Sequence, residues 1–285
     1  MIRMSKTHRA RFAGPVGAAL LALAVLPGGC ASSSDEIAYV ERPVEQIYNE
    51  AMDKLEAGNY KTAAQTFDEV ERQHPYSKWA TKAQIMAGYA YYLRGNYDDA
   101  VNALDRFIEL HPGSRDVAYA YYLKGLCYYE QISDVARDQR MTEQALTVFT
   151  DLVRRFPDTD YARDARLKID LAHDHLAGKE MNVGRFYLRR GNQLAAIGRF
   201  RTVVEKYQTT THVPEALHRL TEAYLALGVV DEARRTAAVL GHNYPDSQWY
   251  RDSWRLLSQQ GILTAEEKGL AQTAGLGAPA LAGEN

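Results

Sequence analysis

The amino-acid sequence predicts an all-α solenoid of about five helix–turn–helix units, and two features of its 285 residues carry this prediction. Short strings containing Gly or Pro recur every 37 residues. Between them, apolar residues have the spacing of amphipathic helices, and Gly and Pro stand where such helices would end. One helix pair cannot bury its apolar face alone, so units of this kind stack on their neighbours.

The 37-residue period is visible in three pairs of matching positions. Gly-Asn-Tyr at residues 58–60 recurs at 95–97, and the prolines Pro75 and Pro112 both follow a histidine. Gly191 and Gly228 are again 37 residues apart. Pro157 comes 45 residues after Pro112, which indicates an insertion of about eight residues in the third unit.

Twelve segments have helical periodicity. One of them, at 160–177, is additional to the repeats, and the sequence allows it to continue past Gly178 into the next segment. The expected helices lie at 44–57, 61–73, 79–94, 98–110, 116–131, 142–155, 160–177, 180–190, 194–207, 213–227, 231–243 and 247–258.

Within a unit, the small and aromatic residues have fixed offsets that resemble the tetratricopeptide repeat. Gly is expected to end the first helix in a left-handed conformation, and Pro ends the second because it cannot continue a helix. The fourth unit has Gln208 where this proline is expected. An open stack of hairpins favours a binding module over a catalyst. The second unit supplies Gly88, Tyr91, Gly95, Tyr97, Ala100, Leu104, Phe107 and Pro112.

The first 29 residues have the organisation of a bacterial export signal. Basic residues precede an apolar run at 12–26, which is too short for a spanning helix, and Cys30 follows two glycines. The string Leu-Pro-Gly-Gly-Cys at 26–30 resembles a lipobox, although Pro27 departs from the usual pattern. We expect a signal peptide at 1–29, lipidation of Cys30 and a flexible tether at 30–42; a plain cleaved signal that leaves Cys30 as a free thiol is the alternative.

The other cysteine, Cys127, lies in a helical pattern and is expected to be a buried thiol rather than a disulfide partner of Cys30. At the other end, the Gly/Ala-rich segment 259–285 is expected to be a disordered tail after a repeat domain at 43–258.

Charge and motifs favour neither nucleic-acid binding nor catalysis. Four of the 34 Lys and Arg residues precede residue 30, so residues 30–285 carry 30 bases against 36 acids. His173 and His175 are two residues apart on a helix and cannot share one metal ion. No phosphate loop or catalytic signature is recognisable. We therefore expect no cofactor, no metal and no enzymatic activity.

Tyrosine is the most conspicuous residue type, with 19 Tyr against seven Phe. Tyrosine offers rigid amphipathic area suited to a peptide-binding groove. Tyr91 and Tyr128 fit repeat-core positions, whereas the core pattern does not demand Tyr92 and Tyr122. The groove candidates are Tyr89, Tyr92, Tyr119 and Tyr122. Arginines in the C-terminal half form either solvated faces or a ridge for a partner; they include Arg154, Arg155, Arg189, Arg190, Arg199, Arg201 and Arg219.

Several local strings, together with the lipobox and the third-unit insertion, make residues 40–258 resemble the BamD (ComL/YfiO) family of outer-membrane protein assembly factors, which are tetratricopeptide-repeat lipoproteins. These strings are Tyr-Ala-Tyr-Tyr at 89–92, Asp-Arg-Phe-Ile at 105–108, Asp-Gln-Arg at 138–140, Phe-Pro-Asp-Thr-Asp-Tyr-Ala at 156–162, and Tyr119 with Tyr122, Gly125 and Leu126.

The resemblance implies a lipoprotein anchored in the inner leaflet of the outer membrane and facing the periplasm. Such proteins work with other BAM lipoproteins, dock on the POTRA domains of BamA and receive unfolded outer-membrane proteins for folding and insertion. The family's substrate groove lies in the N-terminal units, here 43–157, and the BamA contact in the C-terminal units, here 158–258. Arg199 matches a basic docking residue, whose expected partner is a carboxylate.

Two other functions remain open from the residues alone. A periplasmic repeat scaffold of the envelope-constriction or cell-wall machinery has the same repeat pattern. A coiled coil usually precedes the repeats of such proteins, and none is visible in this sequence. A cell-wall hydrolase or its activator would need a catalytic domain, for which the chain has no room.

Overall fold

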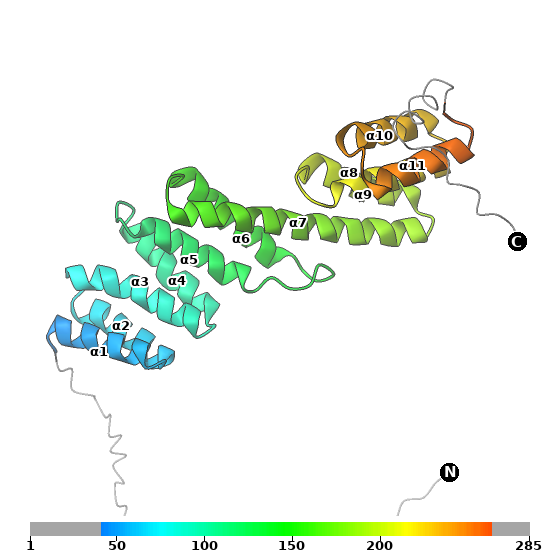
Figure 1. Cartoon of the computed structure of the whole chain (residues 1–285). Helices are drawn as coiled ribbons and strands as arrows, with labels where there is room; N and C mark the ends of the chain where they lie inside the picture. Colours follow the sequence, from blue (N-terminus) through cyan, green and yellow to red (C-terminus); the bar gives the residue numbers. More distant parts are fainter. Residues whose placement is uncertain (1–40, 264–285) are drawn as a thin grey trace, which may run out of the picture. The chain divides into compact units, whose positions relative to one another are not determined.

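The computed structural model describes residues 41–263, which form eleven α-helices and no strand (Figure 1). The expected signal peptide, Cys30, most of the tether and most of the tail lie outside these residues. The helices are α1 (Val44–Glu56), α2 (Tyr60–Gln73), α3 (Lys78–Leu93), α4 (Tyr97–Leu110), α5 (Val117–Tyr129), α6 (Arg140–Arg155), α7 (Asp160–Arg189), α8 (Gln193–Lys206), α9 (Val213–Ala226), α10 (Val230–Asn243) and α11 (Gln248–Gln259).

Each helix up to α10 packs mainly against the helices before and after it in the chain, as a stack of hairpins requires, and α11 packs on α9 and α10. This confirms the all-α tetratricopeptide-repeat solenoid. The turns also follow the expected chemistry. Gly58 and Gly95 end the first helices of their units with φ of 76° and 77°, a left-handed conformation that favours glycine.

After the first, third and fifth units, a Pro-x-Ser/Thr string leads into the next helix. The proline stands just after a second helix, and the hydroxyl two residues later caps the helix that follows. Ser77 accepts a hydrogen bond from the backbone N–H of Ala80, and Thr159 accepts one from that of Ala162. One short string therefore ends one helix and begins the next.

Small residues on the first helix of a unit meet large side chains on the second. A Cβ at Gly125 would lie 2.3 Å from the ring of Phe149, and one at Gly184 would lie 2.5 Å from the ring of Phe200. Both phenylalanines have no exposed surface. At these two positions the helices approach so closely that only glycine fits.

Helix α7 is one continuous helix of 30 residues, so the two segments expected at 160–177 and 180–190 are joined. Gly178 lies within it and is buried. Two loops cover this glycine: His212 and Val135 stand 3.2 and 3.5 Å from where its Cβ would be. Gly178 therefore leaves room for two neighbouring loops, and the helix continues through it.

The insertion of the third unit, residues 130–139, is fastened to the middle of α7. His175 Nε2 lies 2.7 Å from the carbonyl oxygen of Ser133, and Lys179 donates to the carbonyl oxygen of Ala136 at 2.9 Å. The inserted residues therefore hold the middle of α7 by contacts with two backbone carbonyls.

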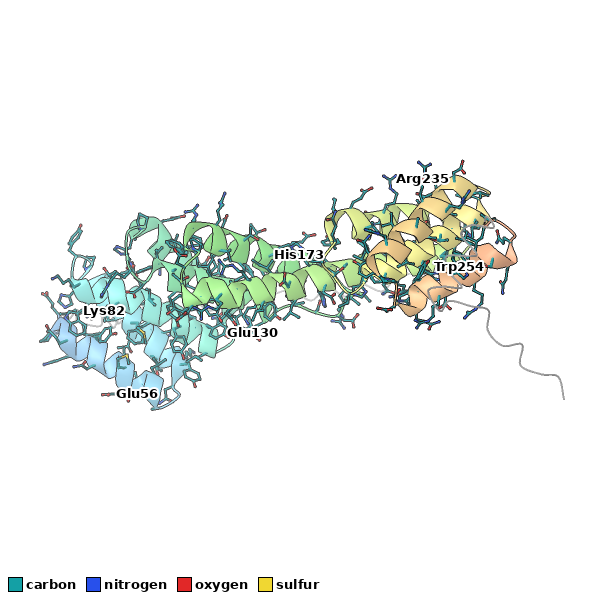
Figure 2. All side chains as sticks on the ribbon, turned by 45° about the horizontal axis from the view of Figure 1, so that its top comes forward. Glu56, Lys82, Glu130, His173, Arg235 and Trp254 are labelled. Carbon is teal, nitrogen blue, oxygen red and sulfur yellow. The ribbon has the colours of Figure 1, made fainter. Side chains whose placement is uncertain are left out.

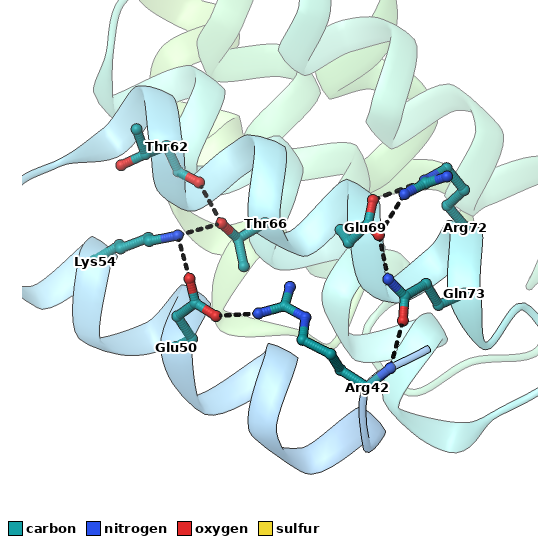
Figure 3. Close-up of polar contacts among 8 residues, drawn as sticks. All are labelled: Arg42, Glu50, Lys54, Thr62, Thr66, Glu69, Arg72 and Gln73. Atoms are coloured by element: carbon teal, nitrogen blue, oxygen red, sulfur yellow. Dashed lines mark hydrogen bonds and ion pairs between the residues drawn. The ribbon is translucent and has the colours of Figure 1, made fainter. Parts of the chain in front are cut away.

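At the N-terminal end, polar contacts fasten the chain to the first hairpin (Figure 3). The Arg42 side chain donates to Glu50 at 2.6 Å, and its backbone N–H donates to Gln73 at 3.0 Å. Lys54 links Glu50 to Thr66 on α2. The last residue of the expected tether is thus held against α1 and α2. At the other end, the packed chain continues through Leu263, which is buried beside Leu257.

Candidate functional site

The four groove candidates come from two neighbouring first helices. Tyr89 and Tyr92 are three residues apart on α3, and Tyr119 and Tyr122 are three apart on α5, so each pair shares one helix face. All four are partly buried. The structure also brings the pairs together, because Tyr89, Tyr92 and Tyr119 all pack against the same hydrophobic cluster.

A fifth tyrosine, Tyr161 near the start of α7, completes this cluster. Its ring centroid lies 5.4 Å from that of Tyr119 and also 5.4 Å from that of Tyr122, both in tilted arrangements. We call these five residues the tyrosine face. Sequence reasoning missed Tyr161 as a site residue because it lies in the helix outside the repeat count, although one of the family strings contains it.

Burial and neighbouring oxygens hold the hydroxyls of Tyr119 and Tyr122 in their neutral form. Burial raises the pKa of Tyr119 to about 12, and the adjacent Tyr89 and Tyr161 add to the effect. Burial also raises the pKa of Tyr122, whose hydroxyl donates a 2.7 Å hydrogen bond to Asp164. Tyr119 and Tyr122 are therefore uncharged over the physiological pH range.

Tyr92 lies at the α3 end of the tyrosine face. Its ring is 6.0 Å from that of Tyr97, the first residue of α4. Burial raises the pKa of Tyr92, with a further contribution from Glu130, which follows α5 and is labelled in Figure 2. Aromatic surface bordered by carboxylates suits an apolar segment that also carries hydrogen-bonding or basic groups.

Tyr91, assigned to the core from its repeat position, lies partly buried between two hydrophobic clusters. Its hydroxyl donates to Asp68 on α2 at 2.6 Å. Burial raises the pKa of Asp68, although the hydrogen bond from Tyr91 opposes this. Both residues line a pocket of about 460 Å³, which sequence reasoning did not find because α2, α3 and α4 all contribute to it. The rest of its lining is Asp99, Asn102, Ala103, Asp105, Arg106 and Glu109.

Cys127 is a buried thiol on α5, as expected. Burial raises its pKa to about 12, which keeps it protonated and unreactive. His173 and His175 contact different partners: the His173 ring lies 5.8 Å from that of Tyr207, and His175 bonds the Ser133 carbonyl. Among residues 41–263, no group of three or more His, Cys, Asp or Glu side chains is placed to hold a metal ion.

Arg199, the candidate docking residue, lies on α8 and has 46% of its side chain exposed. Its Nη1 donates to both carboxylate oxygens of Glu180 on α7, at 3.1 and 3.3 Å. The sequence led us to expect a carboxylate on a partner protein. The carboxylate that the structure places at Arg199 belongs to the same chain.

The other half-buried arginines of the C-terminal units form a chain of ion pairs. Arg185 on α7 contacts Glu215 on α9 at 2.8 Å, and Arg219 contacts both Glu215 and Glu222 at 3.4 and 2.7 Å. Burial alone would raise the pKa of Glu222, but hydrogen bonds from His218 and Arg219 outweigh it and lower the pKa. These charges are largely satisfied within the chain.

Helix α11 is attached to α9 through the same region. His218 Nδ1 lies 2.8 Å from the hydroxyl oxygen of Ser253, which has no exposed surface. The Trp249 ring lies 5.3 Å from the His218 ring, and the Arg219 guanidinium lies 5.3 Å from Trp249. Aromatic and polar contacts thus combine to fix the last helix; Figure 2 labels Trp254 on it.

The described helices define a tetratricopeptide-repeat protein with a tyrosine face on α3, α5 and the start of α7 and with arginine–carboxylate pairs between the end of α7, α8 and α9. None of the helices in the described range 41–263 has both the length and the apolar character to cross a membrane. Residues 40–240 match the family YfiO, described as outer membrane lipoprotein.

The curated relatives agree with this match. The chain is 51% identical to the outer membrane protein assembly factor BamD of Caulobacter vibrioides over 93% of this chain and 87% of that protein. It is 48% identical to the BamD of Rickettsia prowazekii over 84% of this chain and 95% of that protein. A tetratricopeptide-repeat protein of Thermus thermophilus aligns at a TM-score of 0.36 and 19% identity, over 78% of this chain and 100% of that one. The chain belongs to the BamD (YfiO) family.

Proposed function

We propose that this protein is an outer-membrane protein assembly factor and a subunit of a BAM complex. Cys30 carries its lipid anchor, which holds the chain on the inner leaflet of the outer membrane with the repeats in the periplasm. The C-terminal units dock on the POTRA domains of BamA, with Arg199 in the contact. The N-terminal units receive unfolded outer-membrane proteins, and other BAM lipoproteins join the assembly.

The observation that carries the receptor role is the tyrosine face. Five tyrosines, four of them partly buried, are drawn from α3, α5 and α7, and an extended segment with an aromatic end can stack on such rings. The Tyr122 hydroxyl already donates to Asp164, so the segment would contact the ring rather than this hydroxyl. This is a binding role, and no step of it needs a reacting group.

The receptor role is tested with a peptide that ends in an aromatic β-strand sequence. Replacing Tyr92 and Tyr122 together by Ala removes two rings of the face and should weaken peptide binding about tenfold or more. The matched control is Tyr76→Ala, because Tyr76 is fully exposed in a turn and belongs to no cluster. Equal affinity of the double variant and the control would refute the tyrosine face as the receptor.

The assembly role is tested by purifying the tagged full-length chain from detergent-solubilised membranes. We expect a POTRA-containing barrel protein in near-equal amount. Arg199→Glu should reduce its recovery at raised salt, whereas Arg201→Glu on the same helix should not, because Arg201 pairs with Glu205 instead. Recovery of division or cell-wall proteins in place of the barrel protein would contradict the assembly role.

A further inference from the structure

Arg199 uses only one of its three guanidinium nitrogens within the chain. Nη1 contacts Glu180, whereas Nε and Nη2 have no partner in the described range 41–263. A guanidinium presents five N–H donors in a planar fork, and a carboxylate engages one edge of that fork with two parallel bonds. One edge of Arg199 is therefore available to a second carboxylate.

The other arginines nearby differ in this respect. On the same helix, Arg201 directs both Nε and Nη2 to Glu205, one turn further along. Arg219 already divides its fork between Glu215 and Glu222. Arg219 also demonstrates, within this chain, that one guanidinium can hold two carboxylates at once.

Glu180 is well placed to fix the orientation of Arg199. Its side chain is only 19% exposed, on the long helix α7, and it bridges to α8 through the Arg199 contact. Its charge also raises the pKa of Tyr207, after the larger effect of burial, so it lies beside packed structure. A long side chain held in one rotamer loses less freedom when a partner binds.

The surface beside Arg199 is open. Gly198, the preceding residue, is exposed in the interior of α8, and a Cβ there would meet nothing within 4 Å. Glycine disfavours a helix interior, and neither a left-handed turn nor a close internal contact requires it at this position. The missing side chain leaves room for a partner backbone to come close to the guanidinium.

We propose that Glu180 is a positioning residue for docking: it holds Arg199 by Nη1 so that the Nε–Nη2 edge points to a carboxylate of the partner. The partner surface at this point is acidic and approaches α8 closely at Gly198. This inference rests on the docking role proposed above for Arg199, and it adds the residue through which that role is set up.

The test is a double-mutant cycle on the full-length chain, with the purified POTRA domains of the cognate barrel protein as the probe. Arg199→Ala should weaken binding about tenfold, the loss expected for one charge-assisted contact. Glu180→Gln should weaken it about threefold, as an exposed ion pair allows. The double variant should bind no more weakly than Arg199→Ala, because Glu180 acts only through Arg199.

A merely structural role for Glu180 would lower the melting temperature and weaken binding equally in both backgrounds, and this result would overturn the proposal. Tighter binding by Glu180→Gln would also overturn it, since Glu180 would then compete with the partner. If Arg199→Ala loses affinity as expected but Glu180→Gln binds with unchanged affinity, the positioning role of Glu180 is refuted and docking through Arg199 stands. Unchanged affinity in Arg199→Ala would refute docking through Arg199 and the positioning role with it.

Discussion

The N-terminal and C-terminal units use the same packing frame but display opposite chemistry. In both, a glycine on a first helix faces a buried phenylalanine on the second, as Gly125 faces Phe149 and Gly184 faces Phe200. Around that frame, α3, α5 and the start of α7 carry neutral tyrosines, whereas the end of α7, α8 and α9 carry arginines paired with carboxylates. The frame positions specify the fold, and the positions between them specify what each region can bind.

The difference also extends to how each region holds its polar groups. The Tyr122 hydroxyl is satisfied by one neighbour, Asp164, from a helix 42 residues further along the chain. In the C-terminal units, Glu222 is shared by His218 and Arg219 on its own helix. Charged pairs are screened by salt, whereas stacked rings are not, so binding by the arginine region should weaken with ionic strength while binding by the tyrosine face changes little.

The largest expected effect comes from the shared frame. Gly125→Ala and Gly184→Ala each place a Cβ within 3 Å of a buried phenylalanine ring, and each should lower the free energy of unfolding by about 1–3 kcal/mol. Urea unfolding of the full chain measures this. Gly113→Ala is the control, because a Cβ at Gly113 meets nothing within 4 Å.

Hydrogen exchange on the same variants sharpens the comparison between regions. In a repeat array each unit contacts mainly its neighbours, so Gly125→Ala should speed exchange most in α5 and α6, and Gly184→Ala most in α7 and α8. Uniform loss of protection along the whole chain would show that the two regions unfold as one cooperative body.

Much of this frame could be predicted from the sequence, since the Gly and Pro positions mark turns through local backbone chemistry alone. The sequence leaves the continuity of α7 open, because Gly178 is accommodated by Val135 and His212 from distant loops. The same limit applies to the sites. The four groove tyrosines could be proposed from the local clustering of tyrosine and from positions that the repeat core does not demand, whereas Tyr161 and the Glu180 partner of Arg199 depend on contacts between helices that no local pattern specifies.

A smaller effect concerns the pH dependence of stability, which the C-terminal charge pairs should show and the tyrosines should not. The pKa of Glu222 is lowered on folding, so its stabilising contribution is present above about pH 4.5 and is lost as the pH falls through the lowered value. Glu222→Gln should therefore destabilise the chain by about 1–2 kcal/mol at neutral pH, discounted for partial exposure, and by less at pH 3. Thermal melts at several pH values test this, and a pH-independent difference would contradict it.

The next variant distinguishes the role of the Tyr122 hydroxyl from that of its ring, and its expected effect on stability is of similar or smaller size. Tyr122→Phe removes the hydrogen bond to Asp164 and should cost about 1 kcal/mol of stability, while peptide binding through the ring should change little. Tyr121→Phe is the control, since the Tyr121 ring packs on Phe156 and no hydrogen bond of its hydroxyl is recorded in the described region. If Tyr122→Phe abolished peptide binding while stability held, the hydroxyl rather than the ring would be the binding group.

The smallest expected effect is a gain of stability, and it occurs at Gly198, a glycine that makes no close contact between helices. Gly198→Ala adds a methyl group on an exposed helix surface with nothing within 4 Å, so stability should rise by about 0.5–1 kcal/mol. Gly88→Ala is the counterpart in the N-terminal units: it should destabilise, because its Cβ would meet Leu104 at 2.9 Å. Suppose that Gly198→Ala gains stability and that the bulkier Gly198→Phe binds the POTRA domains more weakly. The close approach of a partner then accounts for glycine at this position. A loss of stability in Gly198→Ala would mean instead that the α8 surface is packed, and the open approach to Arg199 would be wrong.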